Sequence, residues 1–588
     1  MKKVNPKTLL LLALLVVLGT LPFAKVGSFD FVAYMDRVAI EDWEAKRFRY
    51  INDHVQEGMT KENAAWAFST LQFSPEPLLG DRWRQISWHP LAWLSLLADS
   101  TFWKMDPGGF HLTNLGLHLM STVLCYLVAM RLTRSKFVAF CTAALFCVHP
   151  LQSNVVGWVS ARPALLGGFF FFLSMLMYLR FGDIQRGQPG RKLYFFLSAV
   201  ACLCAVLSKT SNLILPFLFA LTDWRFHRKG FDKDKVFKVG ELLRKQLADK
   251  WVYLTMSAAI LVIASPFRFM RRQPMSDEFN FGNFFTGVFS HFGSYLEHIV
   301  YPVNVLPLYF PFPGAKVGYA HFAIGIICFL GISGTVWAMR RTKPQLIFGW
   351  VWFIICLLPV AGIAHVRFSF TIDYELYAAL FGLFFCVASV AFRWGASSAA
   401  KTWGVFGVFV ILIAACGVGS YMKVGGWKDS ASQIALIRKH NATSAEFYEQ
   451  FLVPAQGAVG NLAEVKEHEA LLKKASALKN SGDTEGAIAA FLTLREQDPK
   501  DPRLAHALGQ LYEESDPEKA GKYFTIACDV TDNNDAAYLH DAALFFLNQR
   551  NAEKAKEFYQ LANGASNKTP EMQKLLERLE REIMNLLQ

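Results

Sequence analysis

Two histidines that each precede a proline are the first residues in this chain whose types suggest chemistry. His89 stands before Pro90, and His149 stands before Pro150. A residue before proline disfavours the helical conformation, so each pair is expected to end or bend a helix. Histidine at membrane depth is costly unless it has polar partners. Each imidazole is interpreted either as a partner for backbone groups freed at a helix end or as part of a polar cavity wall that binds the phosphate or sugar of a substrate.

Several charged residues elsewhere in the chain could carry out a group transfer. A sugar transfer onto a hydroxyl needs a general base and a cation that neutralises a leaving phosphate. Asp36, shortly after the first apolar run, is the best candidate for the base, although an acidic residue in a polar loop is often merely solvated. Arg162, Lys209 and Arg367 stand next to the ends of apolar segments and could bind phosphate, with snorkelling to the interface as the alternative. Asp373 is a further candidate for substrate binding.

Long apolar segments surround these residues. A helix of about 20 apolar residues crosses a bilayer core of about 30 Å. Eleven segments fit this requirement: 8–24, 110–130, 137–158, 164–180, 193–207, 212–224, 251–267, 319–339, 345–363, 376–392 and 403–422. A twelfth apolar stretch, 283–300, is interrupted by His291, Glu297 and His298, so it could span, re-enter or lie at the interface. The first segment lacks a good cleavage site and is interpreted as an uncleaved helix rather than a signal peptide.

The placement of charge predicts the topology. Basic clusters follow alternate apolar segments, which puts the N-terminus in the cytoplasm and residues after 424 on the opposite side. Arg268, Arg271 and Arg272 are an exception, for which an anionic lipid phosphate is one candidate partner. The net charge of +12 is attributed to this bias and not to nucleic-acid binding. Nine of the ten cysteines lie in or beside apolar segments, and no Cys/His spacing fits a zinc site, so we expect no metal or other cofactor.

The polar stretch 25–109 follows the first apolar segment and is predicted to be an outer loop. It is rich in tryptophan, and its residues 59–68 are typical of a short helix with Thr60 as the N-cap. Residues 88–103 are predicted to form an amphipathic helix along the membrane. Such a loop could roof a cavity at the membrane surface.

The chain changes character near residue 425. From Glu464 onward a helical pattern repeats, and Ala487, Ala520 and Ala555 occupy equivalent positions in three units. This spacing is typical of the tetratricopeptide repeat, which has a period of about 34 residues and small residues where its helices touch. Such stacks bind extended peptides in a concave groove. The sequence therefore predicts an α-solenoid of about three repeats and a capping helix.

Several motifs carry a family resemblance over nearly the whole chain. They lie at 88–95, 106–118, 149–151, 158–162, 215–216 with 223–224, 309–314 and 427–429. In this order they resemble bacterial membrane proteins with C-terminal tetratricopeptide repeats, which are related to the eukaryotic transmembrane-and-TPR O-mannosyltransferases. The resemblance implies a GT-C fold, a catalytic Asp in the first outer loop, a polyprenyl-phosphate-linked sugar donor, and a protein hydroxyl as the acceptor. It also implies transfer without a metal.

The chain departs from that family at acidic positions. Asn154 and Ala164 stand where the family usually has acids, and Asp36 stands alone where a pair of acids is usual. The family's Asp-Arg-Tyr step is replaced by the run from Asp373 to Glu375. These departures leave two functions open, an active transferase and a non-catalytic relative.

The predicted organisation is all-α. Residues 1–424 form a GT-C-like membrane domain, 425–460 a helical connector, and 461–588 a periplasmic tetratricopeptide repeat domain. We predict that the protein resides in a bacterial inner membrane. It is expected to transfer a sugar from a polyprenyl-phosphate lipid to a periplasmic protein or glycan that the repeats recruit. The alternative is a catalytically degenerate scaffold for envelope or surface-appendage assembly. A transporter is a weaker option, because no broken helices recur in matching halves of the chain.

Overall fold

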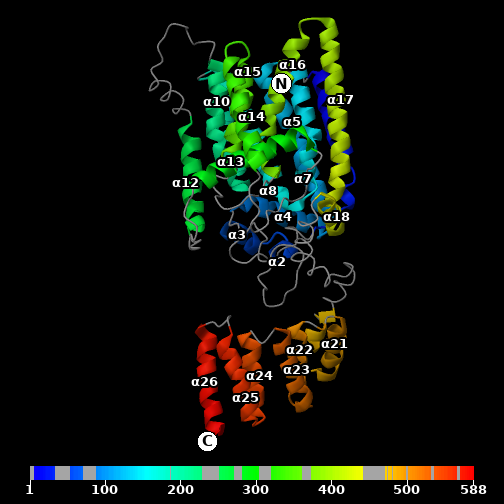
Figure 1. Cartoon of the computed structure of the whole chain (residues 1–588), viewed down its shortest axis with the longest axis vertical. Helices are drawn as coiled ribbons and strands as arrows, with labels where there is room; N and C mark the ends of the chain where they lie inside the picture. The colour runs from blue at the N-terminus through cyan, green and yellow to red at the C-terminus, as the bar shows by residue number, and fades with distance from the viewer. Residues whose placement is uncertain are drawn as a thin grey trace. The chain divides into compact units, whose positions relative to one another are not determined.

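Every regular element that the computed structural model of the protein describes is a helix (Figure 1). The described residues are 5–32, 53–70, 88–185, 187–227, 250–269, 281–302, 319–359, 373–440, 471–472, 474–479, 481–497, 499, 501–531, 535–565 and 570–587. The chain divides into two compact units. We call them the bundle unit, whose described residues lie between 5 and 440, and the C-terminal unit, whose described residues lie between 471 and 587.

The bundle unit consists of α-helices joined by short 3-10 turns. Its α-helices are α1 (Pro6–Thr20), α2 (Asp53–Glu57), α3 (Lys61–Ser69), α4 (Pro90–Trp103), α5 (Pro107–Thr133), α6 (Lys136–Val148), α7 (Ser153–Val156), α8 (Arg162–Asp183), α9 (Arg191–Ser208), α10 (Leu215–His227), α12 (Trp251–Phe269), α13 (Phe281–Val300), α14 (Tyr319–Ala338), α15 (Pro344–Leu357), α16 (Leu380–Gly395), α17 (Ala399–Val424) and α18 (Ser430–His440). The 3-10 turns that matter below are η5 (Pro150–Gln152), η6 (Val159–Ala161), η7 (Thr210–Ile214), η10 (Asp373–Leu376) and η11 (Gly425–Trp427).

The bundle unit is a multi-pass membrane unit. Within the described residues, six helices are long and apolar enough to cross a bilayer: Pro6–Ser28, Pro107–Thr133, Val159–Asp183, Arg191–Ser208, His321–Ala338 and Ala399–Trp427. The helices on either side of His149 add a seventh if they form one span, with a bend of 49° between them. Three shorter apolar helices, Trp251–Ile263, Pro344–Leu357 and Leu380–Gly395, fall on three more of the predicted segments. The predicted count of eleven spans stays a prediction.

Local sequence signals explain where the first helices after α1 lie. The Thr60 hydroxyl accepts a hydrogen bond from the Asn63 amide at 3.0 Å, which confirms the predicted N-cap of α3. The helix predicted at 88–103 is α4, but the prediction that it is amphipathic was wrong. Trp93, Leu96 and Leu97 are buried while Phe102 is 80% exposed, so apolar side chains occur both inside and outside. This helix packs against α2, α3, α5 and α9, and burial among them explains its apolar composition.

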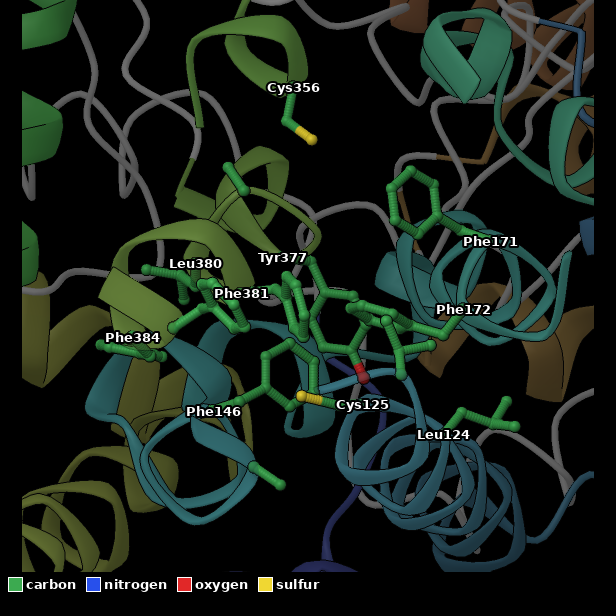
Figure 2. Close-up of a cluster of buried hydrophobic side chains, with 14 of the residues drawn as sticks. Leu124, Cys125, Phe146, Phe171, Phe172, Cys356, Tyr377, Leu380, Phe381 and Phe384 are labelled. Carbon is green, nitrogen blue, oxygen red and sulfur yellow. The ribbon is translucent and has the colours of Figure 1, made fainter. Parts of the chain in front are cut away.

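The core of the bundle unit reaches the end of η10. Figure 2 shows Tyr377, the residue after η10, among Phe146, Phe172 and Phe381. Its ring meets that of Phe146 edge-on with 5.0 Å between centroids, and its hydroxyl lies 2.9 Å from Nδ1 of His118. A side chain on Gly168 would overlap this ring. The sequence therefore anchors η10 through a buried aromatic residue with a satisfied hydroxyl.

Two glycines bring α15 and α16 together. A Cβ atom on Gly349 would overlap the carbonyl oxygen of Gly382, and a Cβ atom on Gly382 would overlap that of Gly349. The backbones of the two helices therefore pass closer than side chains would permit, as is usual where small residues line a membrane helix pair.

The C-terminal unit consists of consecutive packed helices. They are α21 (Thr484–Gln497), α22 (Pro502–Tyr512), α23 (Pro517–Val530), α24 (Ala536–Asn548), α25 (Ala552–Gly564) and α26 (Pro570–Leu587). Each helix from α22 onward packs against the one before it. Ala487, Ala520 and Ala555 are fully buried, as predicted for small residues at helix contacts. Cys528 is also fully buried, in agreement with its interpretation as a small apolar side chain.

Candidate functional site

The short turn η10 carries two carboxylates that pair with groups from other helices. Asp373 is buried, and its two carboxylate oxygens have different partners. Oδ1 lies 2.8 Å from Nδ1 of His298 at the end of α13. Oδ2 accepts a hydrogen bond of 3.5 Å from the side-chain amide of Asn154 on α7. Three segments that are far apart in sequence thus meet at one carboxylate.

A second ion pair lies two residues further along η10. The ammonium of Lys209, directly after α9, is 2.8 Å from a carboxylate oxygen of Glu375. It also lies 4.8 Å from the ring centroid of Tyr374, a cation–π distance. Burial, and to a smaller extent the positive charge of Lys209, lower the pKa of His89 to about 3. His89 is therefore neutral at pH 7 and does not neutralise negative charge.

The structure favours the helix-end interpretation of His149. Its Nδ1 accepts a hydrogen bond from the Leu151 amide in η5, which leaves Nε2 to donate to the carbonyl of Ile299 at 3.0 Å. Both ring nitrogens are engaged with backbone groups, as expected where Pro150 interrupts the helix. His149 thus holds the end of α13, next to His298.

Arg162, a predicted phosphate ligand, has protein groups as its partners. Its side chain is fully buried at the start of α8 and pairs with Asp99 on α4 at 2.6 Å. Its three nitrogens also donate to neutral oxygens, from Nε to Asn114 at 2.6 Å, from Nη1 to Ser95 at 2.7 Å and from Nη2 to the carbonyl of Phe110 at 3.0 Å. A phosphate would have to break this arrangement to reach the guanidinium. The geometry gives Arg162 the task of holding α4, α5 and α8 together.

Two stacked tryptophans join this cluster to the end of the bundle unit. Trp158 and Trp427 stack with 5.2 Å between centroids and 16° between planes. The indole nitrogen of Trp427 donates to Asn154 at 3.1 Å. The side-chain amide of Asn114, the partner of Arg162, donates to the carbonyl of Trp158 at 2.7 Å. The contacts therefore form a connected path from Asp99 to Asp373.

The segment that leads toward Asp36 is held at the same place. The Asp30 amide donates to the carbonyl of Lys428 at 2.8 Å, and the Asp30 carbonyl lies 3.2 Å from Nε2 of His111. Phe31 packs edge-on against Phe110 with 5.3 Å between centroids. Asp36 itself and the phosphate candidate Arg367 lie outside the described residues, as do Arg271 and Arg272, whereas Arg268 belongs to α12.

Some residues of the site were not singled out from sequence as site residues. Asn114 and Ser95 bind Arg162, His298 binds Asp373, and Trp158 and Trp427 stack. A signal existed for His298, because it is a polar interruption of an apolar stretch. Among the described residues, no three His, Cys, Asp or Glu side chains gather as metal ligands would.

Comparison with known proteins identifies the class to which this arrangement is related. Residues 90–289 match the family model described as dolichyl-phosphate-mannose-protein mannosyltransferase. The chain is thus a multi-pass membrane protein related to the membrane O-mannosyltransferases. Protein O-mannosyl-transferase Tmtc1 of Drosophila melanogaster is 33% identical over 128 residues, which are 22% of this chain and 15% of that protein. Protein O-mannosyl-transferase TMTC2 of Homo sapiens is 26% identical over 178 residues, which are 30% of this chain and 20% of that protein.

The relationship covers a limited part of each relative. The chain spans 15% and 20% of the lengths of these two proteins. Among solved structures, the apo crystal structure of the Archaeoglobus fulgidus oligosaccharyltransferase superposes with a TM-score of 0.38 and 12% identity, covering 76% of this chain and 59% of that chain.

Proposed function

We propose that the protein is a membrane glycosyltransferase that transfers a sugar from a polyprenyl-phosphate donor to a periplasmic protein or glycan. One observation carries the proposal. The stretch 90–289 that matches the mannosyltransferase family includes α4 to α10 and α12, and so contains His149, Arg162 and Lys209 and begins directly after His89. The relationship therefore covers the segments that bring Asn154 and Lys209 to η10.

The reaction assigns a task to each group. The acceptor hydroxyl oxygen attacks the anomeric carbon of the sugar while the bond between that carbon and the phosphate oxygen breaks. The hydroxyl proton passes to the carboxylate of Asp36, the proposed general base. The bonding electrons leave with the polyprenyl phosphate, whose charge is stabilised by the ammonium of Lys209 and by Arg367. His89 and Asp373 contribute hydrogen bonds near the donor, and Arg162 and His149 hold the surrounding helices. The transfer needs no metal or other cofactor.

The proposed setting follows from charge placement and the repeat pattern. The N-terminus lies in the cytoplasm of a bacterial cell, the first loop and the C-terminal unit lie in the periplasm, and the protein resides in the inner membrane. The C-terminal unit is a tetratricopeptide repeat stack whose groove recruits the acceptor protein.

A second candidate function is favoured by Asn154. This amide bonds both Asp373 and Trp427 where the family resemblance implies an acid. An amide cannot act as a general base, so the cluster could persist as a structural core. The protein would then be a membrane-anchored scaffold for envelope or surface-appendage assembly, acting through its C-terminal unit.

Purified protein and a panel of undecaprenyl-phosphate sugars distinguish these functions. We expect the wild type to release undecaprenyl phosphate and Asp36→Asn to be inactive but folded. Asp106→Asn changes another carboxylate of the same predicted loop and serves as the matched control, with activity close to wild type. Donor binding without release in the wild type would favour the scaffold. Normal transfer by Asp36→Asn would remove Asp36 from its proposed role.

A further inference from the structure

The two carboxylates of η10 have unequal environments. The Asp373 side chain is fully buried and bonds His298 and Asn154. The Glu375 side chain keeps 15% of its surface exposed, and that of Lys209, its partner, keeps 11%. An incoming ligand can therefore reach the Lys209–Glu375 pair with less rearrangement than the His298–Asp373 pair.

A phosphate at Lys209 would compete with Glu375. The ammonium is a compact charge that binds oxygen anions without a fixed geometry, so a phosphate oxygen could replace a carboxylate oxygen at the same distance. Both anions cannot remain beside the ammonium without strong repulsion, because charges interact strongly in a partly dehydrated environment. Binding of the phosphate thus requires the Glu375 carboxylate to turn away.

The neighbouring aromatic ring suits such an exchange. The ammonium of Lys209 lies over Tyr374 at 4.8 Å, a contact that does not depend on Glu375. Tyr374 in turn meets Trp158 edge-on at 5.5 Å between centroids, within the stacked tryptophan cluster. The ammonium of Lys209 therefore keeps its cation–π contact with Tyr374 while its anionic partner changes.

We propose that Glu375 is the internal counter-ion of the donor-phosphate site and that the phosphate of the lipid donor displaces its carboxylate from Lys209. This inference rests on the proposed function and adds to it a residue that sets affinity for the phosphate. In the empty site Glu375 satisfies a lysine that would otherwise be a partly buried lone charge. After transfer, the carboxylate returns to Lys209 and helps the polyprenyl phosphate to leave.

Binding of two lipids to the full-length protein tests this exchange. The probes are undecaprenyl phosphate and undecaprenol, which differ only in the phosphate, and the protein is kept in nanodiscs. Glu375→Gln removes the competing charge with little change in shape, and Glu375→Asp keeps the charge. Lys209→Met removes the cation. Asp183→Asn is the matched control, because Asp183 is the acidic partner of Arg131 in another ion pair of the bundle.

We expect Glu375→Gln to bind undecaprenyl phosphate on the order of tenfold more tightly than the wild type, as removal of a charged competitor implies. Its affinity for undecaprenol should be unchanged, which a general loosening of the fold would not produce. Glu375→Asp and Asp183→Asn should resemble the wild type, and Lys209→Met should lose the preference for the phosphate.

Two failures are distinguishable. A wild type that prefers the phosphate lipid, together with a Glu375→Gln variant that gains no affinity or loses it, would overturn the counter-ion role and leave the proposed function standing. A wild type that binds both lipids equally, or neither, would contradict the proposed function and the counter-ion role together.

Discussion

At the scale of single residues, the ion pair of Arg162 and Asp99 places two charged side chains in the interior of the bundle unit. Burial raises the pKa of Asp99, and the ion pair and hydrogen bond with Arg162 oppose that rise. The buried positive charge of Arg162 is tolerated because each nitrogen of its guanidinium has a hydrogen-bond partner. Removal of either charge would leave the other without compensation.

We predict that Arg162→Met lowers the free energy of unfolding by about 3–5 kcal/mol. The double variant Arg162→Met with Asp99→Leu should recover part of that loss, because it removes the uncompensated carboxylate. Arg131→Met, at the more exposed pair with Asp183, should cost no more than about 1 kcal/mol and is the control. Thermal unfolding in detergent measures all three. Equal losses at the two pairs would contradict the proposed structural role of Arg162.

At the scale of elements, the contact between α15 and α16 depends on the absence of side chains. We predict that Gly349→Ala lowers the free energy of unfolding by about 1–3 kcal/mol, because the new methyl group would overlap the Gly382 backbone. Gly404→Ala on α17 is the control, since a Cβ atom there meets no heavy atom within 4 Å. The control should be neutral or stabilising by up to about 1 kcal/mol, as usual for this change in a helix. Parallel thermal unfolding of the two variants decides between these outcomes.

Two helices of the C-terminal unit share a charged contact that predicts a pH dependence. Asp541 on α24 lies 2.9 Å from His506 on α22 and 3.0 Å from His540. Burial would raise the pKa of Asp541, but the hydrogen bonds from the two histidines outweigh it and hold the pKa well below its ordinary value of 3.8. The ionised carboxylate is therefore favoured by folding. Its contribution is present above about pH 4 and is lost as the pH falls further.

We accordingly expect the C-terminal unit to lose stability between about pH 4 and about pH 2. Asp541→Asn should be less stable at neutral pH by up to about 1 kcal/mol, since this side chain is partly exposed, and should show a weaker dependence on pH in that window. Scanning calorimetry of the full chain is the measurement. An unchanged acid profile in Asp541→Asn would show that the contact does not stabilise the unit.

At the scale of the whole molecule, each unit has a hydrophobic core of its own. The main core of the bundle unit runs from Leu15 to Trp427, and those of the C-terminal unit run from Ala475 to Leu508 and from Ala520 to Ile583. Removal of one unit is therefore compatible with folding of the other.

We predict that a chain lacking residues 461–588 binds undecaprenyl phosphate with an affinity within about twofold of that of the intact protein. The reason is that the residues proposed to bind the phosphate belong to the bundle unit. Transfer to a protein acceptor at low concentration should fall on the order of tenfold or more, since the recruiting groove raises the local acceptor concentration. Lipid binding and acceptor glycosylation are measured on the same preparation. Unchanged glycosylation would contradict the recruiting role of the C-terminal unit.

The sequence by itself determined the helical class and most helix positions. It also determined where small side chains stand at the repeated helix contacts. Apolar runs, the N-cap Thr60 and the recurring alanines Ala487, Ala520 and Ala555 act through hydrophobicity and propensity over short windows, so they can be interpreted without the fold. The sequence also singled out Lys209 and Asp373 and both His-Pro pairs.

Only the tertiary structure decided which of these residues meet. His298 and Asp373 are 75 positions apart and Asn154 and Trp427 are 273 apart, so their contacts depend on how distant helices pack. Packing likewise buried Arg162 against Asp99, where its guanidinium links α4, α5 and α8. It also gave both nitrogens of His149 backbone partners. A residue's type limits the chemistry it can do, but its partners and its exclusion from water decide which chemistry remains.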